Sequence, residues 1–174
     1  ARQLVVLNSA TGELERRFSN RIGWDSPVLW SPDSRFIHID VWSPSPGDAW
    51  TPALVSPDDG QTRLLLDGVR ATLSDPRWSN DSRFLMGQLL KENQTTLVKI
   101  DHETGSIQPL SPSGVNIFAK ETYSSHDPSG RIVFLKSSPS APPDLWLING
   151  AQKSRPITGL NPQIEQISFG AVRD

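Results

Sequence analysis

The sequence predicts an all-β fold, a β-propeller fragment of about three and a half four-stranded antiparallel blades. The first observation is a repeat, because WSPDSRF at residues 30–36 returns as WSNDSRF at residues 78–84. Arg131 lies as far beyond Arg83 as Arg83 lies beyond Arg35, in HDPSGRIVF, where another turn with an Asp precedes an apolar run. The second observation is a series of turns half a period out of phase with the first, which contain Gly12, Gly60 and Gly105. Short strands that repeat at roughly 40 to 50 residues are typical of propellers.

The composition permits this fold and excludes several classes of function. The chain has 174 residues, 36% of them apolar, with 12 Gly, 15 Pro and no Cys, as expected for one turn-rich globular domain. A formal net charge of −2 without clusters of Lys or Arg indicates that neither nucleic acid nor a membrane is a partner. No apolar run is long enough to span a membrane, and no leader is evident. Without cysteine, disulfides and thiol chemistry are excluded, whereas cytoplasmic and periplasmic or secreted locations both remain open.

Each blade is expected to supply four strands in chain order. The second strands are the apolar runs at residues 36–41, 84–89 and 132–135, which are bounded by Pro, Asp, Ser and Gly. Because neighbouring blades cover both faces of a sheet, these runs need not alternate between apolar and polar residues. The expected division is a half blade at 1–19, three blades at 20–68, 69–114 and 115–159, and an exit segment at 160–174.

The turns that precede the second strands explain why particular residues recur. Asp33 and Asp81 can accept a hydrogen bond from the backbone N–H two residues on, and the position after each favours a positive φ. Gly130 fits this position at least cost, whereas Ser34 and Ser82 hold it in the other two turns, which are expected to be somewhat strained or of another turn type. The residues of the repeated turns are Trp30, Asp33, Arg35, Trp78, Asp81, Arg83, Asp127, Gly130 and Arg131.

Prolines and tryptophans indicate where the outer strands and the packing surfaces lie. Pro109 and Pro156 fall in fourth strands, and a missing N–H is tolerated there only at an edge, so the fourth strand is expected to be outermost. Trp30 and Trp78 are interpreted as packing between blades rather than as ligand contacts, because large aromatic side chains dominate buried packing.

The longest loop between second and third strands is the candidate contact loop. In WSPSPGDAW at residues 42–50, Trp42 and Trp50 flank a tip rich in Pro and Gly. Loops carry specificity on a rigid scaffold, so these two residues are candidates for contact with a peptide or a partner domain. The alternative is a stiff hairpin in which the two tryptophans pack against each other. The corresponding loop of the next repeat, KENQ, is short and polar.

The sequence contains no recognisable catalytic, cofactor-binding or metal-binding set. The histidines at positions 38, 102 and 126 lie in three separate repeats, without the spacing of a zinc site. Ser124, Ser125, His126 and Asp127 resemble a triad in composition, but adjacent residues cannot form the hydrogen-bonded chain of a catalytic triad. We therefore expect no catalytic residue, no cofactor and no metal in this chain.

The C-terminal region resembles the end of the propeller in the prolyl oligopeptidase family of serine peptidases, especially its acylaminoacyl-peptidase-like bacterial members. Ser138, Pro142, Pro143, Asp144 and Leu145 match one motif of that family, and Ile157, Thr158, Leu160, Asn161 and Pro162 match the next, with Ile in place of Leu. The resemblance implies a non-catalytic propeller that gates and orients peptide substrates for a hydrolase domain. The nucleophile of that family lies in a Gly-x-Ser-x-Gly turn, and no two glycines here are four residues apart.

Two other functions remain open at this point. The WSPDSRF turn also resembles a turn of TolB-like propellers, so the chain is alternatively an interaction module of the TolB-like or WD type. It is otherwise part of a propeller enzyme such as a glycosidase or lyase, which would need carboxylates that face the channel.

The blade count also predicts partners for this chain. Three and a half blades are fewer than the four to eight that close a ring. The chain is therefore expected either to belong to a longer protein, in which the resemblance implies a hydrolase domain as the partner, or to form a homodimer whose ring has about seven blades.

Overall fold

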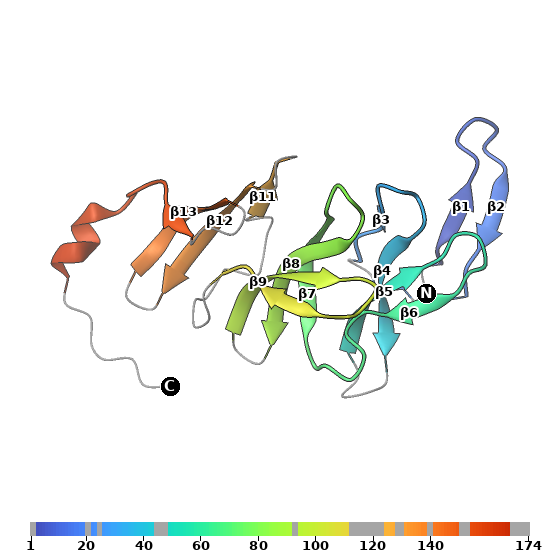
Figure 1. Cartoon of the computed structure of the whole chain (residues 1–174), viewed down its shortest axis with the longest axis horizontal. Coiled ribbons are helices and arrows are strands. Elements are labelled where there is room, and N and C mark those ends of the chain that lie inside the picture. Colours follow the sequence, from blue (N-terminus) through green and yellow to red (C-terminus); the bar gives the residue numbers. More distant parts are fainter. Residues whose placement is uncertain are drawn as a thin grey trace.

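A computed structural model of the chain describes residues 3–19, 22–23, 26–43, 49–91, 94–111, 124–127, 131–138, 141–149 and 154–167. These residues form three four-stranded antiparallel sheets and one two-stranded sheet (Figure 1). The prediction of an all-β fold, a partial β-propeller, is confirmed.

The strands follow the chain as antiparallel meanders. The two-stranded sheet, called the N-terminal hairpin below, contains β1 (Val5–Leu7) and β2 (Leu14–Arg17). The first sheet contains β3 (Leu29–Trp30), β4 (Ile37–Ser43), β5 (Ala49–Val55) and β6 (Thr62–Leu64). The second sheet contains β7 (Thr72–Trp78), β8 (Phe84–Lys91), β9 (Gln94–Asp101) and β10 (Ile107–Pro109). The third sheet contains β11 (Ser124–His126), β12 (Arg131–Ser138), β13 (Ala141–Asn149) and β14 (Arg155–Pro156), and the 3₁₀ helix η1 (Pro162–Gln166) follows it.

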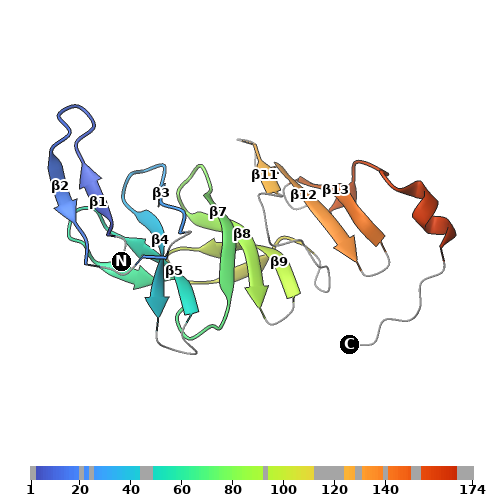
Figure 2. The ribbon, with the colours of Figure 1, turned by 180° about the vertical axis from the view of Figure 1, so that it is seen from behind.

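The sheets succeed one another along the long axis of the molecule. Figures 1 and 2 show the N-terminal hairpin at one end of this row and the third sheet at the other. The turns β1–β2, β3–β4 and β7–β8 all point to the same side of the row, toward the top of Figure 1. The arrow of β4 points to the opposite side, toward the bottom of Figure 1, so the end of the first sheet where β4 ends and β5 begins is opposite the repeated turns.

Proline positions fit the strand order. Pro109 and Pro156 lie in β10 and β14, which are outer strands, as the sequence predicted. Pro52 lies in the central strand β5, opposite Asp40, and sequence reasoning did not single it out. The Asp40 carbonyl accepts from the Gly23 N–H at 3.0 Å, so it does not require a donor from Pro52, and on the other side the Pro52 carbonyl accepts from the Leu65 N–H at 2.8 Å just beyond the end of β6.

Both faces of the first and second sheets are buried against neighbouring sheets. One apolar cluster joins the N-terminal hairpin to the first sheet, a second joins the first sheet to the second, and a third joins the second sheet to the third. Within β4, Ile37, Ile39 and Val41 face the hairpin, whereas the alternate residue His38 is fully buried on the other face. This double coverage explains why the second strands lack strict alternation.

The two WS(P/N)DSRF turns have the same hydrogen-bond network. Ser31 Oγ donates to Asp33 Oδ1 at 2.6 Å and accepts from the Phe36 N–H at 3.0 Å, while the Arg35 N–H donates to Asp33 Oδ1 at 3.1 Å. In the second turn the corresponding three distances, among Ser79, Asp81, Arg83 and Phe84, are 2.5, 2.8 and 3.1 Å. The serine hydroxyl bonds lower the pKa of both aspartates. The motif therefore recurs as a unit in which Ser, Asp, Arg and Phe all take part in one network.

The backbone of these turns has the predicted conformation. Ser34 and Ser82 both have φ of 61°, in the left-handed region where Gly was expected to be easier. Gly130, the glycine predicted for this position in the third repeat, lies outside the described residues.

The third turn differs in length from the first two. In the first two sheets Trp30 pairs with Ile37 and Trp78 with Leu85, but in the third His126 pairs with Ile132, one residue closer in sequence. Asp127 follows β11 and binds the first residue of β12, because its carboxylate accepts from the Arg131 N–H at 2.9 Å and from Arg131 Nε at 2.6 Å. The three arginines are evenly spaced in sequence but are not structurally equivalent. Arg35 and Arg83 precede β4 and β8, whereas Arg131 is the first residue of β12.

Candidate functional site

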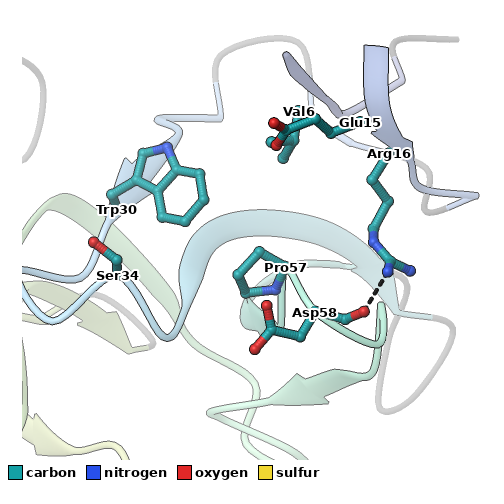
Figure 3. Close-up of a pocket in the computed structure, with 7 residues that line it drawn as sticks. All are labelled: Val6, Glu15, Arg16, Trp30, Ser34, Pro57 and Asp58. Carbon is teal, nitrogen blue, oxygen red and sulfur yellow. Dashed lines mark hydrogen bonds between the residues drawn. The ribbon is translucent and has the colours of Figure 1, made fainter. Parts of the chain in front are cut away.

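An open cleft of about 430 Å³ lies between the N-terminal hairpin and the first sheet, on the side of the row to which the repeated turns point. Figure 3 shows Trp30 on one side of this cleft, Glu15 and Val6 on another, and Pro57 between Trp30 and Arg16. β2 and the β5–β6 turn therefore supply the charged groups, and the end of β3 supplies the aromatic ring. The sequence did not predict this cleft, because its residues come from three separated segments.

The charged groups of the cleft are unequally engaged. The Arg16 guanidinium donates to the backbone carbonyl oxygen of Asp58, a bond that connects the hairpin to the first sheet. One carboxylate oxygen of Glu15 accepts a hydrogen bond from Asn8 Nδ2 at 3.0 Å. Trp30 is 48% exposed, so an aromatic face and two carboxylates, those of Glu15 and Asp58, are available in the cleft. Such a surface can bind a planar or cationic side chain of a peptide.

The exposure of Trp30 corrects one sequence-based interpretation. Trp78, its counterpart, is only 8% exposed, packs between the first two sheets and donates from Nε1 to the Leu29 carbonyl at 3.3 Å, as predicted for both tryptophans. Among the described residues, the sheet that precedes Trp30 is the two-stranded hairpin, without a strand in the position of β3. Between the first two sheets, His102 also contributes to the packing, and its ring lies 5.8 Å from that of Trp78.

The predicted contact pair Trp42 and Trp50 lies at the other end of the first sheet. The two residues are opposite each other on β4 and β5, and their rings meet edge to face with centroids 5.3 Å apart. This geometry matches the stiff hairpin that the sequence left as one alternative. Trp42 is 38% exposed, so the pair also presents an aromatic surface, on the side of the row opposite the cleft. The tip of the loop between them, residues 44–48, lies outside the described residues.

A buried ionisable pair lies between the first and second sheets. His38 is fully buried, and its Nε2 lies 3.8 Å from Asp40 Oδ1. Neither ring nitrogen has a hydrogen-bond partner among the described residues. Burial lowers the pKa of His38 to about 4 and raises the pKa of Asp40 to about 6. Near neutral pH the imidazole is therefore neutral and the carboxylate is ionised.

The exit segment is fastened to the third sheet by one threonine. Thr158 Oγ1 donates to Asp144 Oδ1, and the Leu145 N–H donates to Thr158 Oγ1 at 3.0 Å. The Ile157 N–H donates to the Leu145 carbonyl at 2.9 Å. Asn161 and Pro162 follow at the start of η1, with the proline in the first turn, where it costs no hydrogen bond. We call the bonded set of Asp144, Leu145 and Thr158 the clasp.

Other predicted residues form no chemical site in the described part of the chain. Ser124, Ser125 and His126 are successive residues of β11, and the positions of their side chains lie outside what the structure describes. Among the described residues, no group of three His, Asp or Glu side chains is placed to hold a metal ion. No helix within the same residues is long and apolar enough to cross a membrane.

Solved structures of several propeller proteins are similar to this chain. A puromycin-hydrolysing peptidase from Mycobacterium tuberculosis matches with a TM-score of 0.64 and 14% identity, over 88% of this chain and 23% of the peptidase. TolB from Acinetobacter baumannii matches with a TM-score of 0.62 and 15% identity, over 84% of this chain and 35% of TolB. An oligogalacturonate lyase from Vibrio parahaemolyticus matches with a TM-score of 0.59 and 13% identity, over 90% of this chain and 46% of the lyase.

These similarities support the propeller fold and do not determine the function of the chain. The chain spans less than half the length of each of these three proteins. No model of a known protein family matches the sequence, and no curated protein sequence matches it. The same fold occurs in a peptidase, in TolB and in a lyase, so it is compatible with all three functions considered from the sequence.

Proposed function

We propose that the chain is the non-catalytic propeller portion of a serine peptidase of the prolyl oligopeptidase family, where it gates and orients peptides for a hydrolase domain. The clasp carries this proposal. The two motifs that resemble the family are separated in sequence, and their residues Asp144, Leu145 and Thr158 bind one another in the third sheet. The resemblance thus describes one local structure instead of two unrelated matches.

The clasp gives the exit segment a defined path. Thr158 holds the chain against β13, and η1 begins four residues later. In this proposal residues 160–174 lead to the hydrolase domain, so a fixed exit would hold that domain over one end of the blades. Peptides that approach the active site would then contact the blade ends on the side that this domain covers, where either the cleft at Trp30 or the Trp42–Trp50 pair presents an aromatic surface.

The experiment uses the complete product of the gene that encodes this chain. We expect a fluorophosphonate probe to label it and short peptidyl nitroanilides to be hydrolysed, with casein largely excluded. Thr158→Val removes the clasp hydroxyl, so casein cleavage should rise several-fold relative to short-peptide cleavage. Thr72→Val, on an exposed strand position without this bond, is the matched control and should leave the ratio unchanged. A product that neither reacts with the probe nor cleaves peptides would refute the proposal.

A TolB-like interaction module is the second candidate. The match to Acinetobacter TolB is about as good as the match to the mycobacterial peptidase, with TM-scores of 0.62 and 0.64. The same labelling experiment separates the two candidates, because an interaction module has no nucleophile to label. For this candidate, capture of a specific protein that is lost on Trp42→Ala would replace the peptidase assay.

A further inference from the structure

Asp40 is a partly buried carboxylate without a charged or hydrogen-bonded partner among the described residues. Its side chain is 17% exposed, and its Oδ1 lies 3.8 Å from His38 Nε2, which is too far for a hydrogen bond. Both ring nitrogens of His38 are likewise without a partner in the described part of the chain. Burial is the cause of the raised pKa of Asp40, and no neighbouring cation or donor opposes it there.

Three other aspartates are paired with arginine. Asp75, Asp101 and Asp127 each lie within 3.0 Å of an arginine nitrogen. Asp40, between the first two sheets, has no such arginine within the residues that the structure describes. A carboxylate that is ionised near neutral pH and held away from water costs free energy unless a partner compensates its charge. Groups of this kind are concentrated at binding and catalytic sites, so Asp40 indicates a ligand of opposite charge.

The second sheet shows that the fold does not require a carboxylate at this position. Asp40 is four residues beyond the Phe of the first repeated turn, and the corresponding residue of the second sheet is Gln88. Gln88 is 1% exposed, so the equivalent strand position accommodates a neutral side chain. Two residues on, Leu90 and Thr95 are opposite each other where the first sheet has its two paired tryptophans. The negative charge and the aromatic pair are therefore features of the first sheet and not of the repeat.

The Trp42–Trp50 pair lies beside this carboxylate. Asp40 and Trp42 are alternate residues of β4, so their side chains are on one face of the sheet and about 7 Å apart along the strand. On this face His38 is fully buried, whereas Trp42 is 38% exposed. Exposure thus increases toward the end of β4, which points to the bottom of Figure 1, and a ligand reaches the carboxylate from this side.

An aromatic surface beside an unpaired carboxylate favours an organic cation as the ligand. The two indole rings meet edge to face, and the exposed part of Trp42 can attract a positive charge to its ring. A metal ion is disfavoured because it needs several ligating side chains, and the described residues include no group of three His, Asp or Glu placed to hold one. Among organic cations, a guanidinium both pairs with a carboxylate through two hydrogen bonds and stacks on an aromatic ring.

We propose that Asp40, Trp42 and Trp50 form a binding site for an arginine side chain of a peptide. The guanidinium donates to the Asp40 carboxylate, while the methylene groups behind it pack against the exposed part of Trp42. The role of this site rests on the proposed function, because the peptide is then a substrate that the propeller orients by its basic side chain. Binding itself depends only on residues of the first sheet.

Calorimetric titration of the complete gene product tests the site. The protein is first treated with the fluorophosphonate probe, so that peptides are bound but not cleaved. The ligands are acetyl-Ala-Ala-Arg-Ala-Ala-amide and the same peptide with citrulline in place of arginine, which keeps the shape of the side chain without its charge. We expect the arginine peptide to bind about tenfold more tightly than the citrulline peptide, because hydrogen bonds between charged groups are stronger than those of neutral groups.

Two substitutions locate this preference at the proposed residues. Asp40→Asn keeps the shape of the side chain and removes its charge, so it should abolish the preference and leave citrulline-peptide binding unchanged. Trp42→Leu, which copies Leu90 of the second sheet, should weaken binding of the arginine peptide several-fold. Glu103→Gln is the control, since it removes an exposed carboxylate at the other end of the sheets, after the residue that pairs with Phe84, and should keep the full preference. Circular dichroism confirms that each variant is folded.

The outcomes separate the site from the proposed peptidase function. Equal binding of the two peptides by the parent protein would overturn the site, as would a preference for arginine that survives Asp40→Asn. Equal weakening of both peptides by Asp40→Asn would show that Asp40 supports the fold and not the guanidinium, and would overturn it too. A product that the probe does not label but that prefers arginine through Asp40 would refute the peptidase alone. A labelled product without this preference would refute the site alone.

Discussion

Ser34 and Ser82 adopt the same strained backbone conformation in different surroundings. Both have φ of 61°, a region that costs residues other than Gly roughly 1–2 kcal/mol. The Ser82 hydroxyl is buried and accepts the Asp33 N–H of the preceding sheet at 2.9 Å. Ser34 is exposed, and its hydroxyl has no such bond among the described residues. One serine therefore has a reason to replace Gly, and the other does not.

This contrast predicts opposite outcomes for one substitution. Ser34→Gly should raise the free energy of unfolding by about 0.5–1 kcal/mol, because relief of strain exceeds the added flexibility of the unfolded chain. Ser82→Gly relieves the same strain but leaves the Asp33 N–H without its partner, a loss of about 1 kcal/mol, so it should bring no gain. Urea unfolding of the two variants measures the difference. Equal stabilisation by both would show that the bond to Asp33 contributes nothing.

His38 and Asp40 have opposing effects on stability as pH changes. Asp40 has a raised pKa, so the folded state binds more protons than the unfolded state between about pH 4 and 6, and the free energy of unfolding falls as pH rises there. His38 has a lowered pKa, so the folded state binds fewer protons between about pH 4 and 6.5, and this contribution rises with pH. Each amounts to about 3 kcal/mol, and the two largely cancel.

Removing either residue should expose the contribution of the other. Asp40→Asn should make the free energy of unfolding rise between about pH 4 and 6.5, because the His38 contribution then acts alone. His38→Met, which copies Met86 at the matching position of β8, should make it fall between about pH 4 and 6. Chemical denaturation at a series of pH values provides the test. Two variants with the same pH slope as the parent chain would contradict the assignment.

Gly87 shows how one strand constrains its neighbour. In β7 the register shifts between Ser74 and Arg77, and Asp75 within this bulge has φ of 49°. A Cβ on Gly87, which lies in β8 beside the bulge, would be 2.9 Å from both the Ser74 carbonyl oxygen and Leu73 Cδ1. Only a residue without a side chain permits this approach.

Gly87→Ala is therefore expected to destabilise the second sheet. The free energy of unfolding should fall by about 1–3 kcal/mol, because the bulge or Leu73 must move. Gly159→Ala is the matched control, since no atom lies within 4 Å of its added Cβ and its φ is not in the left-handed region, and it should change the value by less than about 0.5 kcal/mol. Thermal and urea unfolding measure both variants. A neutral Gly87→Ala would show that the bulge adjusts at no cost.

The strands were predictable from sequence where local chemistry determines them. The Asp and Ser side chains of the repeated turns bond to their own backbone, and prolines identify the outer strands, so short segments contain that information. The bulge at Asp75 depends on the close approach of Gly87 from β8, which no local pattern of β7 reveals. The shorter third turn, too, became visible only from the pairing of His126 with Ile132.

The functional surfaces could be predicted less well, because they depend on which sheet neighbours which. The sequence identified the Trp42–Trp50 pair, since both residues belong to one hairpin. The cleft combines β2, the end of β3 and the β5–β6 turn, three segments that no local sequence pattern connects. The clasp was present in the sequence as two motifs, but their contact through Thr158 required the structure.

Trp30 and Trp78 make the dependence on neighbours measurable for the whole molecule. The repeat assigns them the same role, yet only Trp78 has a preceding sheet with a strand that supplies the Leu29 carbonyl. Trp78→Phe should lower the free energy of unfolding by about 1–3 kcal/mol, through the lost hydrogen bond and the lost packing between two sheets. Trp30→Phe should change it by less than about 0.5 kcal/mol, because the side chain is half exposed.

Urea titration followed by far-ultraviolet circular dichroism compares both tryptophan substitutions, because this signal does not depend on the lost tryptophan fluorescence. Equal costs for the two substitutions would mean that Trp30 packs as Trp78 does. A cost confined to Trp78 would mean that the repeated tryptophan acquires its energetic role from the sheet beside it, and that the sequence repeat alone does not determine this role.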